Sequence, residues 1–539
     1  MRYGILMNVM RLSVLALGVL LLLLAGCHKS QPLHAQHAQH EPHDISWFDG
    51  SLEGAFTVAK RENRPVLLYW GAEWCPYCLT LKSTVFPRPD FIAKSHLFLP
   101  VYLDGDDEAA QRWAEKFGVQ GYPTLIVLDP DQHEIIRVGA GRDISQYTTV
   151  LDLALDNLQP ADVLLQSAAG GKSLNADECR RLAYNAWDLD ELDPGSYSTG
   201  ATQLRAAAQQ CPDELKTERA NLTIFAAYYA ARAESRALDA AGSQPSAALS
   251  QLINQVGSIL QHKTLAVSSA QALLSLDDAF FKAVNARGPA VASLVRDSYV
   301  DTMQTAAGDN RFALADQIGF LDGELHALKA LNDSKYRFPT QLETAIDMRI
   351  DAALSGEPNQ YLRTGLLSAS LDLLQDLGDY PKAREIAQAE IAHAGSAGSA
   401  SAYYLEAELA RIAEKQGHAD EAVGLLEQAY RDAQGPSTRF QWGEAYVDGL
   451  LRLSPHDSQR IQEAGSSVIA ELDGSDRIYR RTRVRLEKLD RELRAWNDAA
   501  NGQYADALHE LHARMQQICV KIPDQDPARQ SCDAFLKSA

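Results

Sequence analysis

The chain has little positive charge for its size. Its 539 residues carry 51 Lys and Arg against 71 Asp and Glu, which gives a formal net charge of -20 at pH 7. Nucleic acids and anionic membrane surfaces are bound by basic faces, so this balance argues against both as partners. The composition, 46% hydrophobic and 23% charged, is otherwise that of a folded soluble protein. The length predicts two to four folding units.

Long apolar runs are also scarce. One stretches from Leu12 to Leu24, interrupted only by Ser13. It is shorter than the roughly 20 residues that a helix needs to cross a bilayer. Arg2 and Arg11 precede the run and small residues follow it, which is typical of an export signal.

The end of this run carries a candidate site of lipid attachment. Residues 24–27 read Leu-Ala-Gly-Cys and resemble the bacterial lipoprotein box, in which the signal is cut before a cysteine that is then acylated. The resemblance implies a signal peptide over residues 1–26 and a lipid anchor at Cys27, in the cell envelope and facing the periplasm. His28 stands where an Asp would favour the inner membrane, so the outer membrane is expected. An incidental cysteine after a secretory signal, or an uncleaved signal anchor, are the alternatives.

Residues 27–44 lack apolar periodicity and predict a linker that cannot pack against a core. Histidines recur in it every three residues, and imidazoles at this spacing could share a zinc or copper ion. Flexible histidine tracts bind metal without that being their role, so a spacer remains the main interpretation. The histidines are His34, His37, His40 and His43.

Residues 45–158 alternate helical and strand patterns, which predicts one α/β domain. A helix is expected near residues 52–59, another from residue 76, a third around 113–117 and a last one after residue 143. The third and fourth strands are joined by the turn Asp129-Pro130-Asp131. The strands are expected at residues 65–70, 98–103, 124–128 and 134–138.

The motif Cys75-Pro76-Tyr77-Cys78 lies between a predicted buried strand and a predicted helix. The start of a helix stabilises a thiolate, so Cys75 is expected to be the nucleophile. Cys78 lies one turn further and is expected to resolve the mixed disulfide formed with a client. A static disulfide or half of a zinc site are the alternatives, but no second Cys-x-x-Cys exists to complete four ligands. The pattern predicts dithiol/disulfide chemistry without a cofactor.

The segment Ala72-Glu73-Trp74-Cys75-Pro76-Tyr77-Cys78 resembles the active site of the thioredoxin superfamily. Gly121-Tyr122-Pro123-Thr124, which precedes a strand, matches the cis-proline loop of that family. The alternative for this loop is an ordinary trans proline that opens a strand. The resemblance implies a thioredoxin-like domain, with a central mixed sheet flanked by helices. It also implies a client-binding surface built from Trp74, Pro76, Tyr77, Tyr122 and Pro123.

The strand before the motif lacks a group that thioredoxins usually have. Members of that family carry a buried acid there, whereas this strand reads Leu67-Leu68-Tyr69-Trp70. Tyr69, water or Glu73 could take the proton of the buried cysteine instead. The dipeptide Pro-Tyr is the one found in glutaredoxins. The direction of electron transfer depends on the partner that recharges the site, which the sequence does not name.

After residue 158 the strand patterns almost disappear, and an all-helical region is expected in two parts, residues 159–358 and 359–539. The segment from Gly417 to Ala422 resembles the turn and second helix of a tetratricopeptide repeat, with weaker echoes at Gly378 and Gly502. The spacing is irregular, so the region is described as repeat-like. Such helical repeats are expected to bind a protein partner.

Four further cysteines lie in the helical region. An oxidising envelope permits disulfides, and pairing over short loops would join the ends of neighbouring helices. Buried free thiols are equally compatible with the sequence. The expected pairs are Cys179 with Cys211 and Cys519 with Cys532.

Two functions are compatible with these features. The first, which we favour, is an envelope thiol:disulfide oxidoreductase of the reductase or isomerase type, acting on protein clients with the help of a redox partner. The second is a scaffold or assembly lipoprotein whose helical repeats bind partners, with the thioredoxin fold as a docking module. Metal delivery is least favoured, because no Met ligands lie near the Cys-Pro-Tyr-Cys motif.

Overall fold

The computed structural model of the protein describes residues 45–537 apart from residues 120, 139–143, 157–158, 190–191, 193, 241, 333–335, 357–358, 395–401 and 474–477. The described residues belong to one compact unit. The predicted signal peptide (1–26), the lipidation site Cys27 and the histidine tract all lie outside the described residues.

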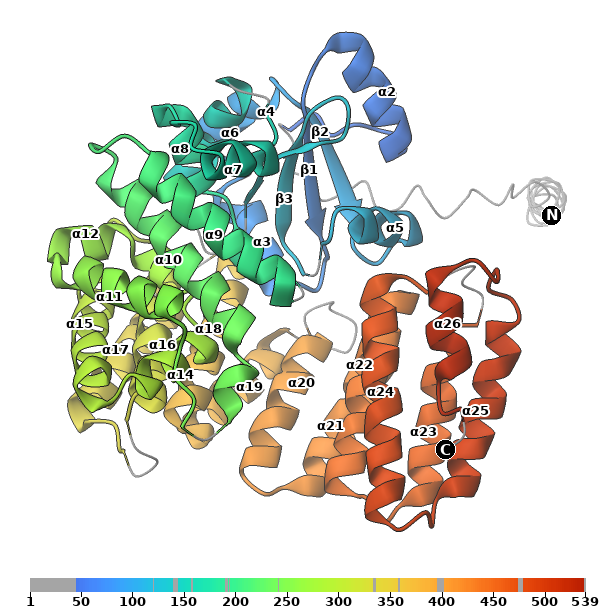
Figure 1. Ribbon diagram of the computed structural model, residues 1–539. Helices are drawn as coiled ribbons and strands as arrows, with labels where there is room; N and C mark the ends of the chain where they lie inside the picture. The colour runs from blue at the N-terminus through green and yellow to red at the C-terminus, as the bar shows by residue number, and fades with distance from the viewer. Residues whose placement is uncertain are drawn as a thin grey trace, which may run out of the picture. The chain divides into compact units, whose positions relative to one another are not determined.

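A four-stranded mixed sheet organises the first part of the compact unit (Figure 1). The strands lie in the order β2-β1-β3-β4; β1 and β2 are parallel, while β3 is antiparallel to both β1 and β4. All residues of β1 are buried, because helices cover both faces of the sheet. The strands are β1 (Val66–Gly71), β2 (Leu99–Asp104), β3 (Thr124–Leu128) and β4 (Glu134–Val138).

Alternate side chains of β1 point to opposite faces of the sheet and enter separate cores. Leu68 and Trp70 pack with residues of helices α2 (Leu52–Glu62) and α5 (Glu108–Lys116). On the other face Leu67 and Tyr69 pack with residues of three helices. These are α3 (Pro76–Thr84), α4 (Pro89–Ser95) and α6 (Ile144–Asp156).

Beyond β4 the described residues contain helices and no strand, which confirms the predicted all-helical region. Two 3-10 turns, at Trp187–Leu189 and Ala237–Asp239, lie among them. The helices are α7 (Ala161–Ala169), α8 (Ala176–Ala183), α9 (Pro194–Gln210), α10 (Lys216–Glu234), α11 (Ala247–Gln261), α12 (Lys263–Ser268), α13 (Ala270–Leu273), α14 (Asp278–Ala286), α15 (Pro289–Ala307), α16 (Leu314–Ala330), α17 (Thr340–Ser355), α18 (Gln360–Leu377), α19 (Tyr380–Ala394), α20 (Ala402–Lys415), α21 (Ala419–Asp432), α22 (Pro436–Leu453), α23 (Ser458–Ala470), α24 (Arg480–Ala499), α25 (Ala505–Cys519) and α26 (Pro527–Ala534).

The three glycines that suggested repeats each lie in a short turn between consecutive helices. Gly378 joins α18 to α19, Gly417 joins α20 to α21, and Gly502 joins α24 to α25, with φ of 90°, 79° and 82°. This left-handed backbone favours glycine after the end of a helix. The turns explain the sequence pattern, and the likeness to tetratricopeptide repeats remains a resemblance.

Two hydrophobic cores run through the helical region and meet at α20. The first extends from α7 to α20, and the second from α20 to the residues after α26. A disulfide between Cys179 and Cys211 joins α8 to the end of α9, and one between Cys519 and Cys532 joins α25 to α26. The structure therefore contains both expected pairs. No described helix is at once long and apolar enough to span a bilayer.

Candidate active site

Cys75 occupies the N-cap position of α3. Its extended backbone (φ -81°, ψ 113°) turns the chain from β1 into the helix, with Pro76 in the first turn. The backbone N–H of Cys78 donates a hydrogen bond to the sulfur of Cys75 over 3.2 Å. The two cysteines are joined as a disulfide with their Cα atoms 5.2 Å apart. In the reduced state the helix start and this N–H would stabilise a thiolate on Cys75.

The loop before β3 brings a second backbone segment close to the sulfur of Cys75. The Tyr122–Pro123 peptide is cis, as the sequence indicated. The carbonyl oxygen of Tyr122 lies 3.5 Å from Sγ of Cys75. A client segment bound along this loop would therefore lie beside the nucleophile.

An acid that the sequence analysis overlooked lies at the end of β2. Asp104 pairs with Gly71 at the end of β1, where the chain leads into the Cys-Pro-Tyr-Cys motif. Burial raises the pKa of Asp104 to about 6, although the N–H of Asp106 donates a hydrogen bond to its carboxylate over 3.1 Å. Asp104 belongs to β2, whereas the sequence analysis considered only the strand that leads into the motif. A parallel neighbour ends at the same edge of the sheet, and the segment Asp104-Gly105-Asp106 was the signal.

Asp106 links the active-site tryptophan to the helical region. Trp74 donates a hydrogen bond from Nε1 to Oδ2 of Asp106 over 3.0 Å. Thr438, in α22, donates one from its hydroxyl to Oδ1 of the same carboxylate. Burial raises the pKa of Asp106, and these two hydrogen bonds oppose that change.

The helical region covers the sulfurs. Cys75 is 4% exposed, Cys78 0% and Trp74 8%. All three belong to the core of the C-terminal helices, together with Tyr403 and Ala407 of α20. The rings of Trp74 and Tyr403 lie 6.4 Å apart between centroids.

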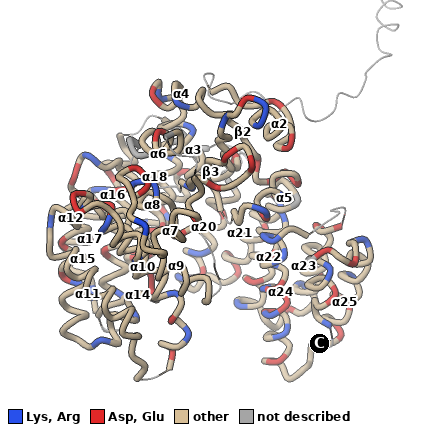
Figure 2. The backbone as a smooth tube through the Cα atoms, turned by 45° about the horizontal axis from the view of Figure 1, so that its top comes forward, with Lys and Arg blue, Asp and Glu red and all other residues tan. Residues whose placement is uncertain are grey.

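Arginines at the start of α24 complete the cover. Arg481 donates a hydrogen bond to the hydroxyl of Tyr122 over 3.1 Å, and its guanidinium lies 4.8 Å from the centroid of that ring. Arg483 forms an ion pair with Glu115 of α5 over 3.0 Å. Figure 2 shows basic residues where α22 and α24 approach α5. This cover has no counterpart in the sequence analysis.

Residues 52–155 match the thioredoxin-like domain family. These residues form a thioredoxin-like domain. It contains the dithiol pair and the cis-proline loop, and the largely helical region follows it.

Known proteins similar to the chain are distant. Thiol:disulfide interchange protein DsbD 2 of Pseudomonas aeruginosa is 32% identical over 85 residues, which is 15% of this chain and 14% of that protein. Nucleoredoxin of Danio rerio is 27% identical over 167 residues, 27% of this chain and 37% of that protein. The chain thus spans well under half the length of either relative. A solved structure named DsbH oxidoreductase aligns with 20% identity and a TM-score of 0.17, covering 20% of this chain and 82% of that one.

The predicted client-binding residues lie next to the cysteines in the chain or in the cis-proline loop, but most of them are not open to solvent. Trp74 and Pro76 are buried, and Tyr122 is partly buried. Tyr77 is the exception, with 38% of its surface exposed. Among the described residues, no three His, Cys, Asp or Glu side chains gather to hold a metal ion.

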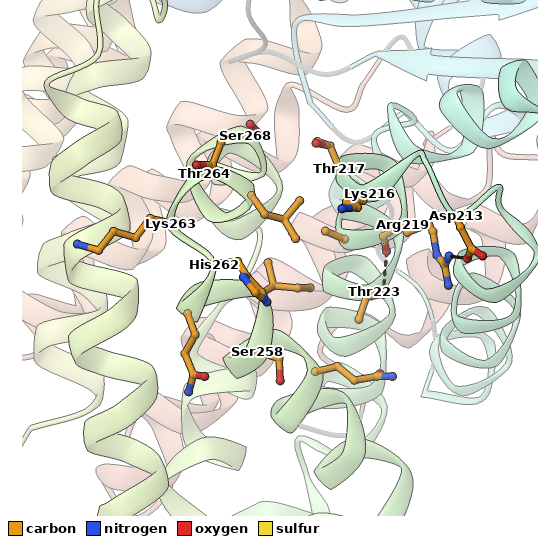
Figure 3. Close-up of a pocket in the computed structure, with 15 residues that line it drawn as sticks. Asp213, Lys216, Thr217, Arg219, Thr223, Ser258, His262, Lys263, Thr264 and Ser268 are labelled. Atoms are coloured by element: carbon orange, nitrogen blue, oxygen red, sulfur yellow. Dashed lines mark hydrogen bonds and ion pairs between the residues drawn. The ribbon is translucent and has the colours of Figure 1, made fainter.

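A separate groove lies in the helical region and contains none of the active-site residues. It has a volume of about 930 Å³ and runs between α10 and the pair α11 and α12 (Figure 3). Lys216, Arg219 and Lys263 are among its lining residues, and Arg219 is paired with Asp213. The groove is therefore not part of the dithiol chemistry.

Proposed function

We propose that the protein is a thiol:disulfide oxidoreductase of the reductase or isomerase type that acts on protein clients. The observation that carries the proposal is the position of Cys75, at the start of α3 and beside the cis-proline loop. This geometry supplies an activated thiolate, a resolving thiol and a backbone edge for a client. The names of the two relatives, an interchange protein and a nucleoredoxin, agree with it.

The reaction transfers two electrons from the dithiol to a client disulfide. The thiolate of Cys75 attacks one client sulfur, forming a mixed disulfide and releasing the other client sulfur as a thiolate. The thiolate of Cys78 then attacks the sulfur of Cys75 and releases the second client thiolate. The protein is left with the Cys75–Cys78 disulfide, which is the state of the structure. A dithiol partner would reduce it for the next cycle.

The client-binding residues in this proposal are those of the predicted surface. The backbone of Tyr122, followed by Pro123, would pair with an extended client segment. Trp74, Pro76 and Tyr77 would border the bound segment.

We place the protein in the bacterial envelope, lipid-anchored through Cys27, facing the periplasm and in the outer membrane rather than the inner. The sequence pattern of residues 1–27 supports this address. The disulfides Cys179–Cys211 and Cys519–Cys532 also suit an oxidising compartment. The helical region would recruit a protein partner there.

A scaffold function is the second candidate. The burial of Cys75 favours it, because a site used only for docking does not need an accessible sulfur. In that case the helical region would bind the protein partners, and the thioredoxin-like domain would serve as a docking module.

Trapping of mixed disulfides tests the proposed function. In a Cys78→Ser variant of the full-length protein, Cys75 can attack a client, but the mixed disulfide that forms cannot be resolved. We expect proteins linked to Cys75 that disappear on addition of dithiothreitol and are absent from a Cys75→Ser variant. Absence of trapping, together with an unchanged cellular phenotype for Cys75→Ser, would favour the scaffold function.

A further inference from the structure

The face of the thioredoxin-like domain that should receive clients is already occupied. Trp74, Cys75 and Cys78 lie in one core with residues of the C-terminal helices. We call α20, α22 and α24 the covering helices, because Tyr403, Thr438 and Arg481 of these helices contact Trp74, Asp106 and Tyr122. A folded protein cannot reach a sulfur that is 4% exposed.

Polar groups connect the covering helices to the thioredoxin-like domain, next to the apolar contact of Trp74 with Tyr403. The carboxylate of Asp106 accepts hydrogen bonds from Trp74 on one side and Thr438 on the other. Arg481 of α24 donates a hydrogen bond to the hydroxyl of Tyr122. Water can replace each of these partners, so breaking these hydrogen bonds costs little net free energy.

One ion pair and one hydrogen bond near the start of α24 add to these polar contacts. Arg483 pairs with Glu115, and the hydroxyl of Tyr479 lies 3.4 Å from a carboxylate oxygen of Glu108. Two glutamates of α5 thus lie beside the arginine-rich start of α24. Such contacts favour one closed arrangement. They contribute little net free energy, because water solvates the charges when they separate.

The apolar cores are arranged so that the two parts can separate here. The cores on the two faces of the sheet contain no residue of α20 to α26. Four buried residues of the thioredoxin-like domain enter the core of the C-terminal helices, namely Ala72, Trp74, Cys75 and Cys78, and the partly buried Tyr122 packs against it. Opening would therefore expose the active-site residues and leave the fold of the sheet intact.

We propose that the covering helices close the dithiol site, and that a protein client reaches Cys75 only after the contacts of Thr438 with Asp106 and of Arg481 with Tyr122 have opened. This inference rests on the proposed oxidoreductase function and adds its regulation. The closed structure is the resting state, and a client or partner that displaces the covering helices admits the substrate.

Alkylation of the reduced protein measures the opening. The full-length protein is reduced with dithiothreitol, treated with iodoacetamide, and the modified Cys75 peptide is quantified by mass spectrometry over time. Thr438→Val removes one hydrogen bond and should raise the rate about threefold, while Thr438→Val with Arg481→Ala should raise it about tenfold. Thr438→Val preserves the shape of the side chain and remains informative if the double variant is unstable.

Arg452→Ala is the matched control. Arg452 pairs with Glu414 and Asp448 inside the helical region and forms no ion pair with the described residues of the thioredoxin-like domain. Cys75 of the Arg452→Ala protein should be alkylated at the wild-type rate. Rates for both Thr438 variants within twofold of the wild type would overturn the proposed closure.

Disulfide reduction separates this inference from the function on which it rests. Opening should speed the reduction of insulin by the variants in the same order as alkylation, and Cys75→Ser should abolish it. If alkylation becomes faster but neither insulin nor 2-hydroxyethyl disulfide is reduced, the closure stands and the oxidoreductase function fails. If both substrates are reduced at the wild-type rate by every Thr438 variant, the function stands and the closure fails.

Discussion

At the scale of single residues, Tyr122 connects the cis-proline loop to its surroundings. Its hydroxyl donates a hydrogen bond to the carbonyl of Gly105 over 2.9 Å and accepts one from Gln111 over 2.9 Å. It accepts another from Arg481 over 3.1 Å. The ring lies so close to Gly105 that any side chain at that position would overlap it. One phenol therefore fixes both the loop and its contact with α24.

Replacement of Tyr122 by Phe should lower the free energy of unfolding by about 1 to 3 kcal/mol, because Gln111, Arg481 and the Gly105 carbonyl lose a buried partner. Denaturant unfolding of the oxidised protein measures this change. Tyr380→Phe is the control, since no hydrogen bond of the Tyr380 hydroxyl is recorded in the described structure, and it should change stability by less than about 0.5 kcal/mol. Equal effects of the two substitutions would show that the network around Tyr122 does not contribute.

The sequence predicted those site residues whose chemistry is local. Cys75, Cys78 and Pro123 were recognisable because their spacing and flanking strands are encoded within short segments. Asp104 was not, because its neighbour Gly71 is brought to it by strand pairing. Arg481 and Thr438 were invisible for the same reason, since their partners lie more than 300 residues away in sequence.

At the scale of secondary structure, α3 is held from behind by α18. Gly365 of α18 faces Thr80 of α3, and a Cβ added at Gly365 would overlap the Thr80 hydroxyl oxygen. The absence of a side chain thus permits the close approach of the two helices. This contact positions the helix whose first turn carries the dithiol.

Gly365→Ala should therefore destabilise the protein by about 1 to 3 kcal/mol through overpacking. Adding Thr80→Ala should recover part of that loss, because it removes the overlapping hydroxyl. Gly424→Ala in α21 is the matched control, since nothing lies within 4 Å of the added Cβ. It should be neutral or stabilise by up to about 1 kcal/mol through helix propensity. A Gly365→Ala protein as stable as the Gly424→Ala protein would contradict the close packing.

The predicted strands agree with the structure to within one residue at each end, because buried β-branched and aromatic runs bounded by turns are strong signals. The prediction of the helices was less complete. A single helix was expected from residue 76, whereas α3 ends at Thr84 and a separate helix, α4, begins at Pro89. Pro87 and Pro89 explain the break, since proline cannot continue a helix. The order predicted for the domain was therefore wrong by one helix.

At the scale of the whole molecule, the helical region does more than follow the thioredoxin-like domain. Its second core incorporates the dithiol, so the two parts share one buried site. Composition and periodicity revealed the helices but not the face they present, because amphipathic patterns indicate burial without indicating the partner. The compact unit of residues 44–539 follows from such contacts.

Buried carboxyl groups are a second property of the whole helical region. Glu324 is 1% exposed and accepts a hydrogen bond from Gln304 over 2.7 Å. Burial raises the pKa of Glu324 to about 7, and it raises that of Glu406 to about 7 as well. Folding at neutral pH therefore takes up protons.

The protein should consequently be more stable at pH 5.5 than at pH 8. Each of these carboxyl groups has a higher pKa in the folded than in the unfolded chain, so its stabilising effect is complete at low pH and is lost as the pH rises through about 7. The slope is about 1.4 kcal/mol per pH unit for each fully buried group. Thermal unfolding at the two pH values measures the difference, and Glu324→Gln, which keeps the acceptor for Gln304, should reduce it by about 2 kcal/mol. Glu385→Gln, at an exposed position of α19, should leave it unchanged. A Glu324→Gln protein with the full wild-type pH dependence would show that this carboxyl group is not protonated in the folded state.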